Sequence, residues 1–133
     1  MSALVLDTNA WVWWSTRPEK LSRRQRSAIE RLRRRGTEAL LVSIMSCWEV
    51  ALLCQLGRFR FTVPVERWLA EASEVPGVEV VPLSLPVIVT AARLTNLRDP
   101  ADMLIVATAL DHGAALVTSD ERIVESGTVE VIG

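Results

Sequence analysis

The chain has 133 residues, half of them hydrophobic, and a net charge of −1. This length and composition exclude a disordered protein and predict a single domain, residues 1–133, with one hydrophobic core. The longest apolar runs are far shorter than the roughly 18 residues of a membrane-spanning helix, and no secretory signal is recognisable. We therefore expect a cytoplasmic protein that does not bind a membrane.

Charge is distributed unevenly along the sequence. Residues 1–35 contain nine of the fifteen basic residues and three of the sixteen acidic ones, a net charge of +6, whereas residues 36–133 carry −7. Lys20 is the only lysine, and arginine suits phosphate recognition. The helix expected at 22–35 is therefore a candidate RNA-binding surface, the alternative being an ordinary solvated helix face.

Strand and helix signals alternate from one end of the chain to the other. Apolar runs predict buried strands at 3–6, 39–43 and 115–120, and mixed runs predict strands at 78–81 and 129–131. Pro82 would place the strand at 78–81 on a sheet edge. Caps, prolines and glycines predict helices at about 10–15, 22–35, 46–57, 64–73, 86–94, 99–113 and 121–125. A short extended segment is also expected at 58–61. The pattern indicates a three-layer α/β/α sandwich around a mainly parallel sheet.

Four acidic residues lie at comparable places in this pattern. Asp7 and Asp120 end predicted strands, Glu49 follows another strand, and Asp102 lies in the first turn of the most apolar helix. The carboxyl ends of parallel strands meet at one sheet edge, where ligands of open α/β folds bind. We therefore expect these four carboxylates to meet there.

Each acid also has an ordinary structural interpretation. Asp7 and Asp120 could be helix caps, Asp102 could complete a capping box with Asp99, and Glu49 could be a partly exposed helix residue. Together, however, four clustered carboxylates repel one another and need a compensating charge. Mg²⁺ or Mn²⁺ would supply it, and carboxylate-held divalent ions of this kind serve phosphoryl transfer.

Four stretches, in this order and at this spacing, resemble the PIN-domain family, and within it the VapC-type toxins of bacterial toxin–antitoxin pairs. They are LVLDTNAW at 4–11, SIMSCWEVALLCQLG at 43–57, RDPADMLIVATAL at 98–110 and LVTSDERI at 116–123. The resemblance covers essentially the whole chain. It implies a PIN-like fold and a metal-dependent endoribonuclease that cleaves tRNA or another structured RNA.

The resemblance also assigns roles to individual residues. Asp7 and Asp102 would be the principal metal ligands, Asp120 would bind metal directly or through water, and Glu49 would hold or deprotonate the attacking water. Asp99 would cap its helix. Hydrogen bonds that support the acids would come from Thr8, Asn9, Thr118 and Ser119.

The sequence departs from the family pattern at two positions. Many such toxins have His-Arg before the Asp-Pro pair, where this chain has Leu97-Arg98, and Arg after the third acid, where it has Met103. Both departures concern contacts around the scissile phosphate rather than the metal ligands. His112, the only histidine, is interpreted as a helix-terminus residue.

Partners follow from the same resemblance. Such toxins form homodimers and are silenced by a small antitoxin that wraps the helices near the site. Candidate exposed anchors for these contacts are Trp11, Trp13, Trp14 and Trp48.

Two other functions stay open. One is a catalytically silent PIN-like module that binds RNA or protein. The other is a phosphoacceptor receiver domain, which has similar size and acids at strand ends but needs a lysine at a strand end, whereas Lys20 falls in a predicted loop.

Overall fold

A parallel sheet forms the centre of the molecule in the computed structural model, which describes residues 3–133. The described residues contribute five strands in the order β3-β2-β1-β4-β5, and every pairing is parallel. The strands are β1 (Leu4–Leu6), β2 (Leu40–Ser43), β3 (Val78–Val81), β4 (Ala115–Val117) and β5 (Val131–Ile132). The parallel topology aligns the carboxyl ends of all the strands on one edge.

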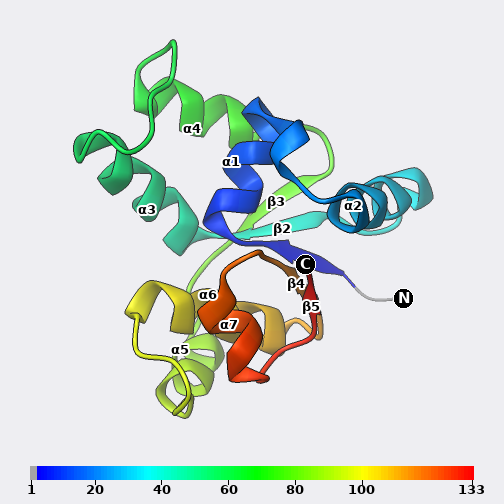
Figure 1. The fold of residues 1–133 in the computed structure, drawn as a ribbon, viewed down its shortest axis with the longest axis vertical. Coiled ribbons are helices and arrows are strands. Elements are labelled where there is room, and N and C mark those ends of the chain that lie inside the picture. The colour runs from blue at the N-terminus through cyan, green and yellow to red at the C-terminus, as the bar shows by residue number, and fades with distance from the viewer. Residues whose placement is uncertain (1–2) are drawn as a thin grey trace.

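Helices cover both faces of the sheet. They are α1 (Thr8–Thr16), the 3₁₀ turn η1 (Pro18–Lys20), α2 (Arg23–Arg35), α3 (Ile44–Gln55), α4 (Val65–Ser73), α5 (Leu85–Ala92), α6 (Pro100–Asp111) and α7 (Glu121–Ser126). Figure 1 shows α1 to α4 on one side of the strands and α5 to α7 on the other. The predicted three-layer α/β/α sandwich is confirmed.

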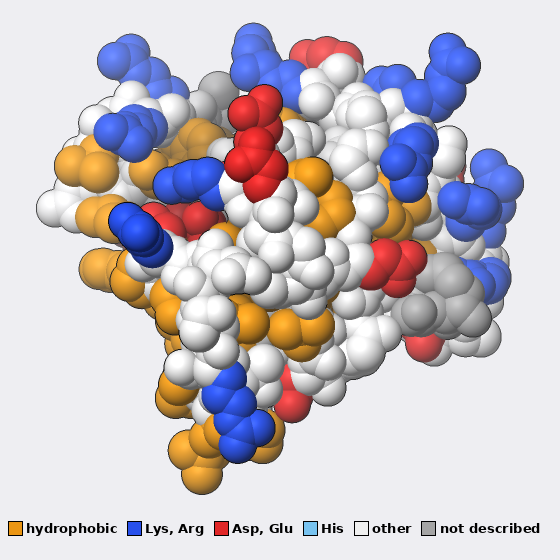
Figure 2. All heavy atoms as spheres, turned by 60° about the horizontal axis from the view of Figure 1, so that its bottom comes forward, with side chains coloured by type: hydrophobic (Ala, Val, Ile, Leu, Met, Phe, Trp, Pro, Cys, Tyr) orange, Lys and Arg blue, Asp and Glu red, His pale blue; other side chains and the backbone are white. Residues whose placement is uncertain are grey.

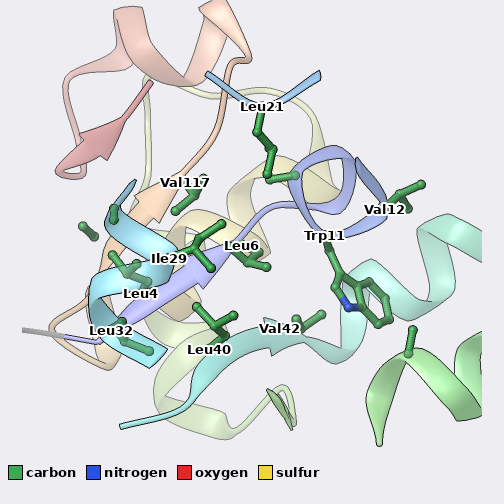
Figure 3. Packing of buried hydrophobic residues seen from close by; sticks show 14 of the residues in the cluster. Leu4, Leu6, Trp11, Val12, Leu21, Ile29, Leu32, Leu40, Val42 and Val117 are labelled. Carbon is green, nitrogen blue, oxygen red and sulfur yellow. The ribbon is translucent and has the colours of Figure 1, made fainter. Parts of the chain in front are cut away.

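Side chains of the central strands alternate between the two faces. Leu4 and Leu6 pack with α1 and α2 on one side, and Figure 3 shows them pointing into a common space with Trp11 and Ile29. Val5 belongs to the opposite cluster, which α6 and α7 complete. Both faces are therefore buried, which is why the strands read as continuous apolar runs.

Several element boundaries differ from the prediction. α1 spans Thr8–Thr16 rather than about 10–15, with Asp7 as its N-cap. β5 is Val131–Ile132 rather than 129–131, and residues 58–61 form no strand. β3 lies at the edge of the sheet, as Pro82 predicted. Short irregular segments carry weak periodicity, so their boundaries depend on tertiary contacts.

The tryptophans divide into three environments. Trp11 is fully buried and meets Trp68 edge to face, with ring centroids 5.0 Å apart. Its prediction as an exposed anchor is therefore wrong, because α1 turns this ring toward the core. Trp13 and Trp14 are half-buried, and the cations of Lys20 and Arg33 lie over them.

Trp48 differs from the other rings, because it is 60% exposed on α3. Large apolar side chains are also exposed on α5, where Leu85, Ile88 and Val89 project. Hydrophobic side chains gather at the lower and left edges of the surface in Figure 2. None of the helices formed by residues 3–133 is long and apolar enough to cross a membrane.

Candidate functional site

Asp7 lies directly after the central strand β1 and is only 7% exposed. Its Oδ1 accepts a hydrogen bond of 2.8 Å from the Ala10 amide, which caps α1. Its Oδ2 accepts a short hydrogen bond from the Thr118 hydroxyl. The carboxylate is both a helix cap and a member of the site, so the two interpretations of Asp7 are compatible.

Glu49 is hydrogen-bonded to Thr8, the residue that follows Asp7. The Thr8 hydroxyl donates to Glu49 Oε1 at 2.5 Å and lies 3.0 Å from the Ser46 hydroxyl. Ser46 and Glu49 are three residues apart, so they share one face of α3. α1 and α3, which follow neighbouring strands, are thereby fixed to each other beside Asp7.

Asp120 and Asp102 are joined through one arginine. The Asp120 amide donates to the Thr118 hydroxyl at 3.1 Å, so Thr118 contacts both Asp7 and Asp120. Arg122 Nη2 lies 3.1 Å from Asp120 Oδ2 and 3.5 Å from Asp102 Oδ2. Asp7, Asp120 and Asp102 are therefore members of one chain of polar contacts at the carboxyl edge of the sheet.

The pKa values of these acids show that their charges interact. Burial raises the pKa of Asp7 to about 6, with the Asp120 and Glu49 charges adding to it and the Thr118 hydrogen bond opposing it. Burial likewise raises the pKa of Asp102 to about 6, helped by the charges of Asp99, Asp120 and Glu49. All four predicted acids thus share one electrostatic neighbourhood.

Asp120 behaves differently from these two acids. Burial alone would raise its pKa, but the hydrogen bonds and positive charge of Arg122 outweigh burial and lower it. The charge of Asp120 is therefore better compensated than the charges of Asp7 and Asp102.

The donor set fits a hard divalent cation by its chemistry. The side chains at this edge are carboxylates, the ligands that Mg²⁺ and Mn²⁺ prefer, and an arginine already acts as a stand-in cation between two of them. In the arrangement described for residues 3–133, no three His, Cys, Asp or Glu side chains are gathered closely enough to hold one metal ion.

The supporting residues fall partly where the sequence placed them. Thr8 and Thr118 bond to site acids, whereas Ser119 accepts a 3.0 Å hydrogen bond from Gln25 of α2. Asn9 is exposed, and its predicted support of the acids stays a prediction. Asp99 caps α6 through a 3.1 Å hydrogen bond from the Asp102 amide, as expected.

The two positions where the sequence departs from the family pattern, Leu97 and Met103, take no part in the polar contacts that join the acids, and neither does His112. Leu97 is buried and Met103 is half-buried, and both pack in the core between α6 and the sheet. His112 is the C-cap of α6 and contacts the Thr108 carbonyl at 2.9 Å. It lies at the opposite end of this helix from Asp102, which matches its interpretation as a helix-terminus residue.

Sequence reasoning missed two residues of the site, Arg122 and Ser46. The spacing Asp120-x-Arg122 at a helix start is a usable signal, because the arginine of the first turn returns toward the capping acid. Ser46 is marked by its position three residues before Glu49. In Figure 2, acidic side chains lie recessed beside basic ones at the left of the view.

A second polar surface lies between α2 and the edge strand β5. A groove of about 770 Å³ runs there, and Glu130 is the only acid among its lining residues. Its basic lining residues are Arg23, Arg24, Arg31 and Arg35. The first turn of α2 is tied to the acidic edge of the sheet, because Gln25 bonds to Ser119 next to Asp120.

Comparison with known proteins gives a consistent assignment. The sequence model of the PIN domain matches residues 4–127. Ribonuclease VapC22 of Mycobacterium tuberculosis is 37% identical over 125 residues, which cover 92% of this chain and 91% of that protein.

Solved structures show the same fold. VapBC-1 from nontypeable Haemophilus influenzae superposes with a TM-score of 0.72 at 15% identity, over 97% of this chain and 96% of that one. A toxin–antitoxin complex from Klebsiella pneumoniae gives a TM-score of 0.64 at 17% identity, over 98% and 96% of the two chains. By its sequence match over nearly the whole chain and by this fold, the protein belongs to the PIN-domain family, and within it to the VapC type.

Proposed function

We propose that this protein is a divalent-metal-dependent endoribonuclease that acts in the cytoplasm as the toxin of a toxin–antitoxin pair. The observation that carries the proposal is the convergence of Asp7, Glu49, Asp102 and Asp120 at one sheet edge. A relative that is 37% identical is named as a ribonuclease, which supports the same reaction. The receiver-domain alternative loses its basis with the PIN-domain match.

The four acids have different proposed roles, which follow from their different environments. Asp7 and Asp102, whose pKa values are raised by burial and by neighbouring acids, are the principal metal ligands, and Asp120 is the third. Glu49, held by the Thr8 hydroxyl, accepts the proton of the attacking water. When bound, Mg²⁺ or Mn²⁺ neutralises charge at the scissile phosphate and favours ionisation of water.

Cleavage of purified total tRNA in Mn²⁺ tests this reaction. We expect wild type to cleave, EDTA to stop cleavage, and excess Mn²⁺ to restore it. Asp7→Asn should be inactive while retaining the helix cap, since asparagine is also a good N-cap residue. Wild-type cleavage in EDTA, or full activity of Asp7→Asn, would overturn the metal assignment. A folded wild type that cleaves no RNA in Mn²⁺ would favour the silent binding module.

RNA reaches this acidic edge along the basic surface of α2. Phosphates repelled by four carboxylates need a compensating positive surface, and the α2–β5 groove provides several arginines. The first turn of the same helix lies near the site, because Gln25 bonds to Ser119 beside Asp120. We therefore infer that α2 binds the RNA backbone and directs it to the acids.

Salt dependence of RNA binding tests the role of α2. The inactive Asp7→Asn protein is compared with the same protein carrying Arg23→Gln, Arg24→Gln and Arg31→Gln. We plot the logarithm of the RNA-binding constant against the logarithm of the salt concentration. The slope should become shallower by roughly one for each phosphate that the substituted side chains no longer bind. Arg67→Gln is the control, because Arg67 lies on α4 in an exposed pair with Glu71. An unchanged slope in the triple variant would exclude this route.

The apolar residues exposed on α3 and α5 are the proposed site for the antitoxin and for a second copy of the chain. Both helices begin just after strands β2 and β3, so their first turns lie on the sheet edge that carries the acids (Figure 1). Trp48 and Leu85 are the most exposed large apolar side chains of these helices. The toxin–antitoxin complex of similar fold supports a partner of this kind.

Growth experiments test the toxin role. Induced expression in a bacterial host should arrest growth, whereas Asp7→Asn should not. Coexpression of the neighbouring small reading frame should restore growth, and light scattering of the purified toxin should give the mass of two copies. Growth arrest by Asp7→Asn as strong as that by wild type would separate toxicity from the nuclease site.

A further inference from the structure

Arg122 is the basic side chain that reaches the acidic site. Its Nη2 atom lies within ion-pair distance of both Asp102 and Asp120, and its Nε is 3.4 Å from Asp120 Oδ1. In the part of the chain that the structure describes, no other ion pair involves any of the four acids. The guanidinium is therefore the resident counter-charge of the site.

The backbone of Arg122 is fixed, whereas its side chain is accessible to solvent. The Arg122 amide donates to Asp120 Oδ1 at 2.9 Å as part of the α7 cap, which anchors the backbone. Its side chain is nevertheless 70% exposed, whereas those of Asp102 and Asp120 are 14% and 25% exposed. The guanidinium thus contacts the acids from the solvent side, at the entrance to the site.

The guanidinium contacts the same carboxylate oxygens that a divalent cation would bind. Arg122 contacts the Oδ2 atoms of Asp102 and Asp120, two of the proposed metal ligands. If these carboxylates held a divalent cation, its charge would compensate theirs and weaken their attraction for Arg122. The guanidinium is then left at the entrance, where an RNA phosphate is a strong acceptor that matches its planar fork.

We propose that Arg122 exchanges partners: it neutralises Asp102 and Asp120 before the cation binds, and afterwards binds an RNA phosphate beside the bond to be cleaved. This inference rests on the proposed function, since it assumes that the acids bind metal. It assigns to this chain a phosphate-binding residue on α7 that lies outside the four acids.

Mn²⁺ affinity measured by calorimetry on RNA-free protein tests the first half of the exchange. Arg122→Gln should bind Mn²⁺ several-fold to about tenfold more tightly than wild type, because the competing charge is gone. Arg122→Lys should stay close to wild type, since the charge is retained. Arg67→Gln, which breaks an exposed pair on α4, should leave the affinity unchanged. Circular dichroism of each variant would check that it is folded.

Steady-state cleavage of tRNA at saturating Mn²⁺ tests the second half. Arg122→Gln should raise KM more than it lowers kcat, and Arg122→Lys should restore part of the loss, because lysine keeps the charge without the fork. Tighter metal binding combined with weaker RNA binding is the expected signature. A purely structural role would weaken both.

Other outcomes overturn the proposal in distinguishable ways. Unchanged or weaker Mn²⁺ affinity in Arg122→Gln, with an active wild type, would exclude competition and leave the proposed function intact. Tighter Mn²⁺ binding with unchanged KM would exclude the phosphate contact. If neither wild type nor Arg122→Gln binds Mn²⁺, the metal site itself is wrong, and the proposed function fails with it.

Discussion

Thr118 donates its hydroxyl hydrogen bond to Asp7 from the neighbouring parallel strand. Leu6 and Val117 are paired in the β1–β4 register, so Asp7 and Thr118 are the next residues along these two strands. The same hydroxyl accepts a hydrogen bond of 3.1 Å from the Asp120 amide. One buried threonine therefore sets the positions of two acids from different elements.

Thr118→Val tests this arrangement with little change of volume. Loss of the hydrogen bond to Asp7 should raise the pKa of Asp7 further, because Thr118 now stabilises the charged form. Mn²⁺ affinity and RNA cleavage should each fall by roughly 10- to 100-fold, as is typical for residues that support metal ligands. Calorimetry and initial cleavage rates measure the two effects.

Thr108→Val is the matched control for this substitution. Thr108 is also a fully buried threonine, but its hydroxyl bonds to the Leu104 carbonyl within α6. It should leave Mn²⁺ affinity at the wild-type value. Equal losses of affinity in both variants would mean that Thr118 acts through general packing.

The metal-free protein should lose stability as pH rises through the pKa of Asp7. Because the folded-state pKa is about 6 and the ordinary value is 3.8, the folded protein favours protonated Asp7. Its contribution to stability is fully present below about pH 4 and is lost as pH rises through 6. A change of this size corresponds to about 3 kcal/mol.

Urea unfolding in EDTA at several pH values measures this contribution. The free energy of unfolding of wild type minus that of Asp7→Asn should fall between pH 4 and pH 7. Asp102, whose pKa is also raised to about 6, should act in the same direction. A difference that is flat or rises with pH would show that Asp7 is not destabilised by its charge.

The sequence predicted the sheet and the position of the acids because both depend on local patterns. Apolar runs such as 3–6 are long enough to identify buried strands, and a parallel sheet brings their carboxyl ends together. Asp7 and Asp102 could therefore be placed at one edge from the sequence alone.

Features that depend on side-chain direction could not be predicted in the same way. Trp11, Trp13 and Trp14 are close in sequence, and only the rotation of α1 decides that Trp11 enters the core. The ion pair between Arg122 and Asp102 joins two helices separated by the strand β4, so no local pattern reveals it.

Divalent cations should stabilise the folded protein if the acids bind them. At a Mn²⁺ concentration 100 times the Kd, the gain is about 2.7 kcal/mol, which corresponds to an increase in Tm of about 10 °C for a domain of this size. Differential scanning calorimetry should detect this in wild type and find little change in Asp102→Asn. An equal increase in the two proteins would indicate binding elsewhere.

Truncation of Trp11 and of Trp48 should change the free energy of unfolding by very different amounts. Trp11→Ala removes a fully buried ring and should cost roughly 3–5 kcal/mol of unfolding free energy. Trp48→Ala removes a ring that is mostly exposed and should change stability by about 0.5 kcal/mol or less. Urea unfolding gives both values.

The affinity for the antitoxin, unlike the stability of the fold, should depend strongly on Trp48. Trp48→Ala should weaken the complex with the antitoxin by more than tenfold if this ring is an interface anchor. A stability loss of Trp48→Ala close to that of Trp11→Ala would mean that the ring is part of the core. Wild-type antitoxin affinity in Trp48→Ala would place the partner elsewhere.

The central claim is that the acids at the carboxyl edge of the sheet carry out RNA cleavage, and two acids of the same helix test it most directly. Asp102 lies in the first turn of α6 within the cluster, whereas Asp111 ends the same helix and is exposed. Single-turnover cleavage of tRNA in Mn²⁺ should be abolished by Asp102→Asn and should proceed at the wild-type rate in Asp111→Asn. Cleavage by Asp102→Asn at the wild-type rate would contradict the account.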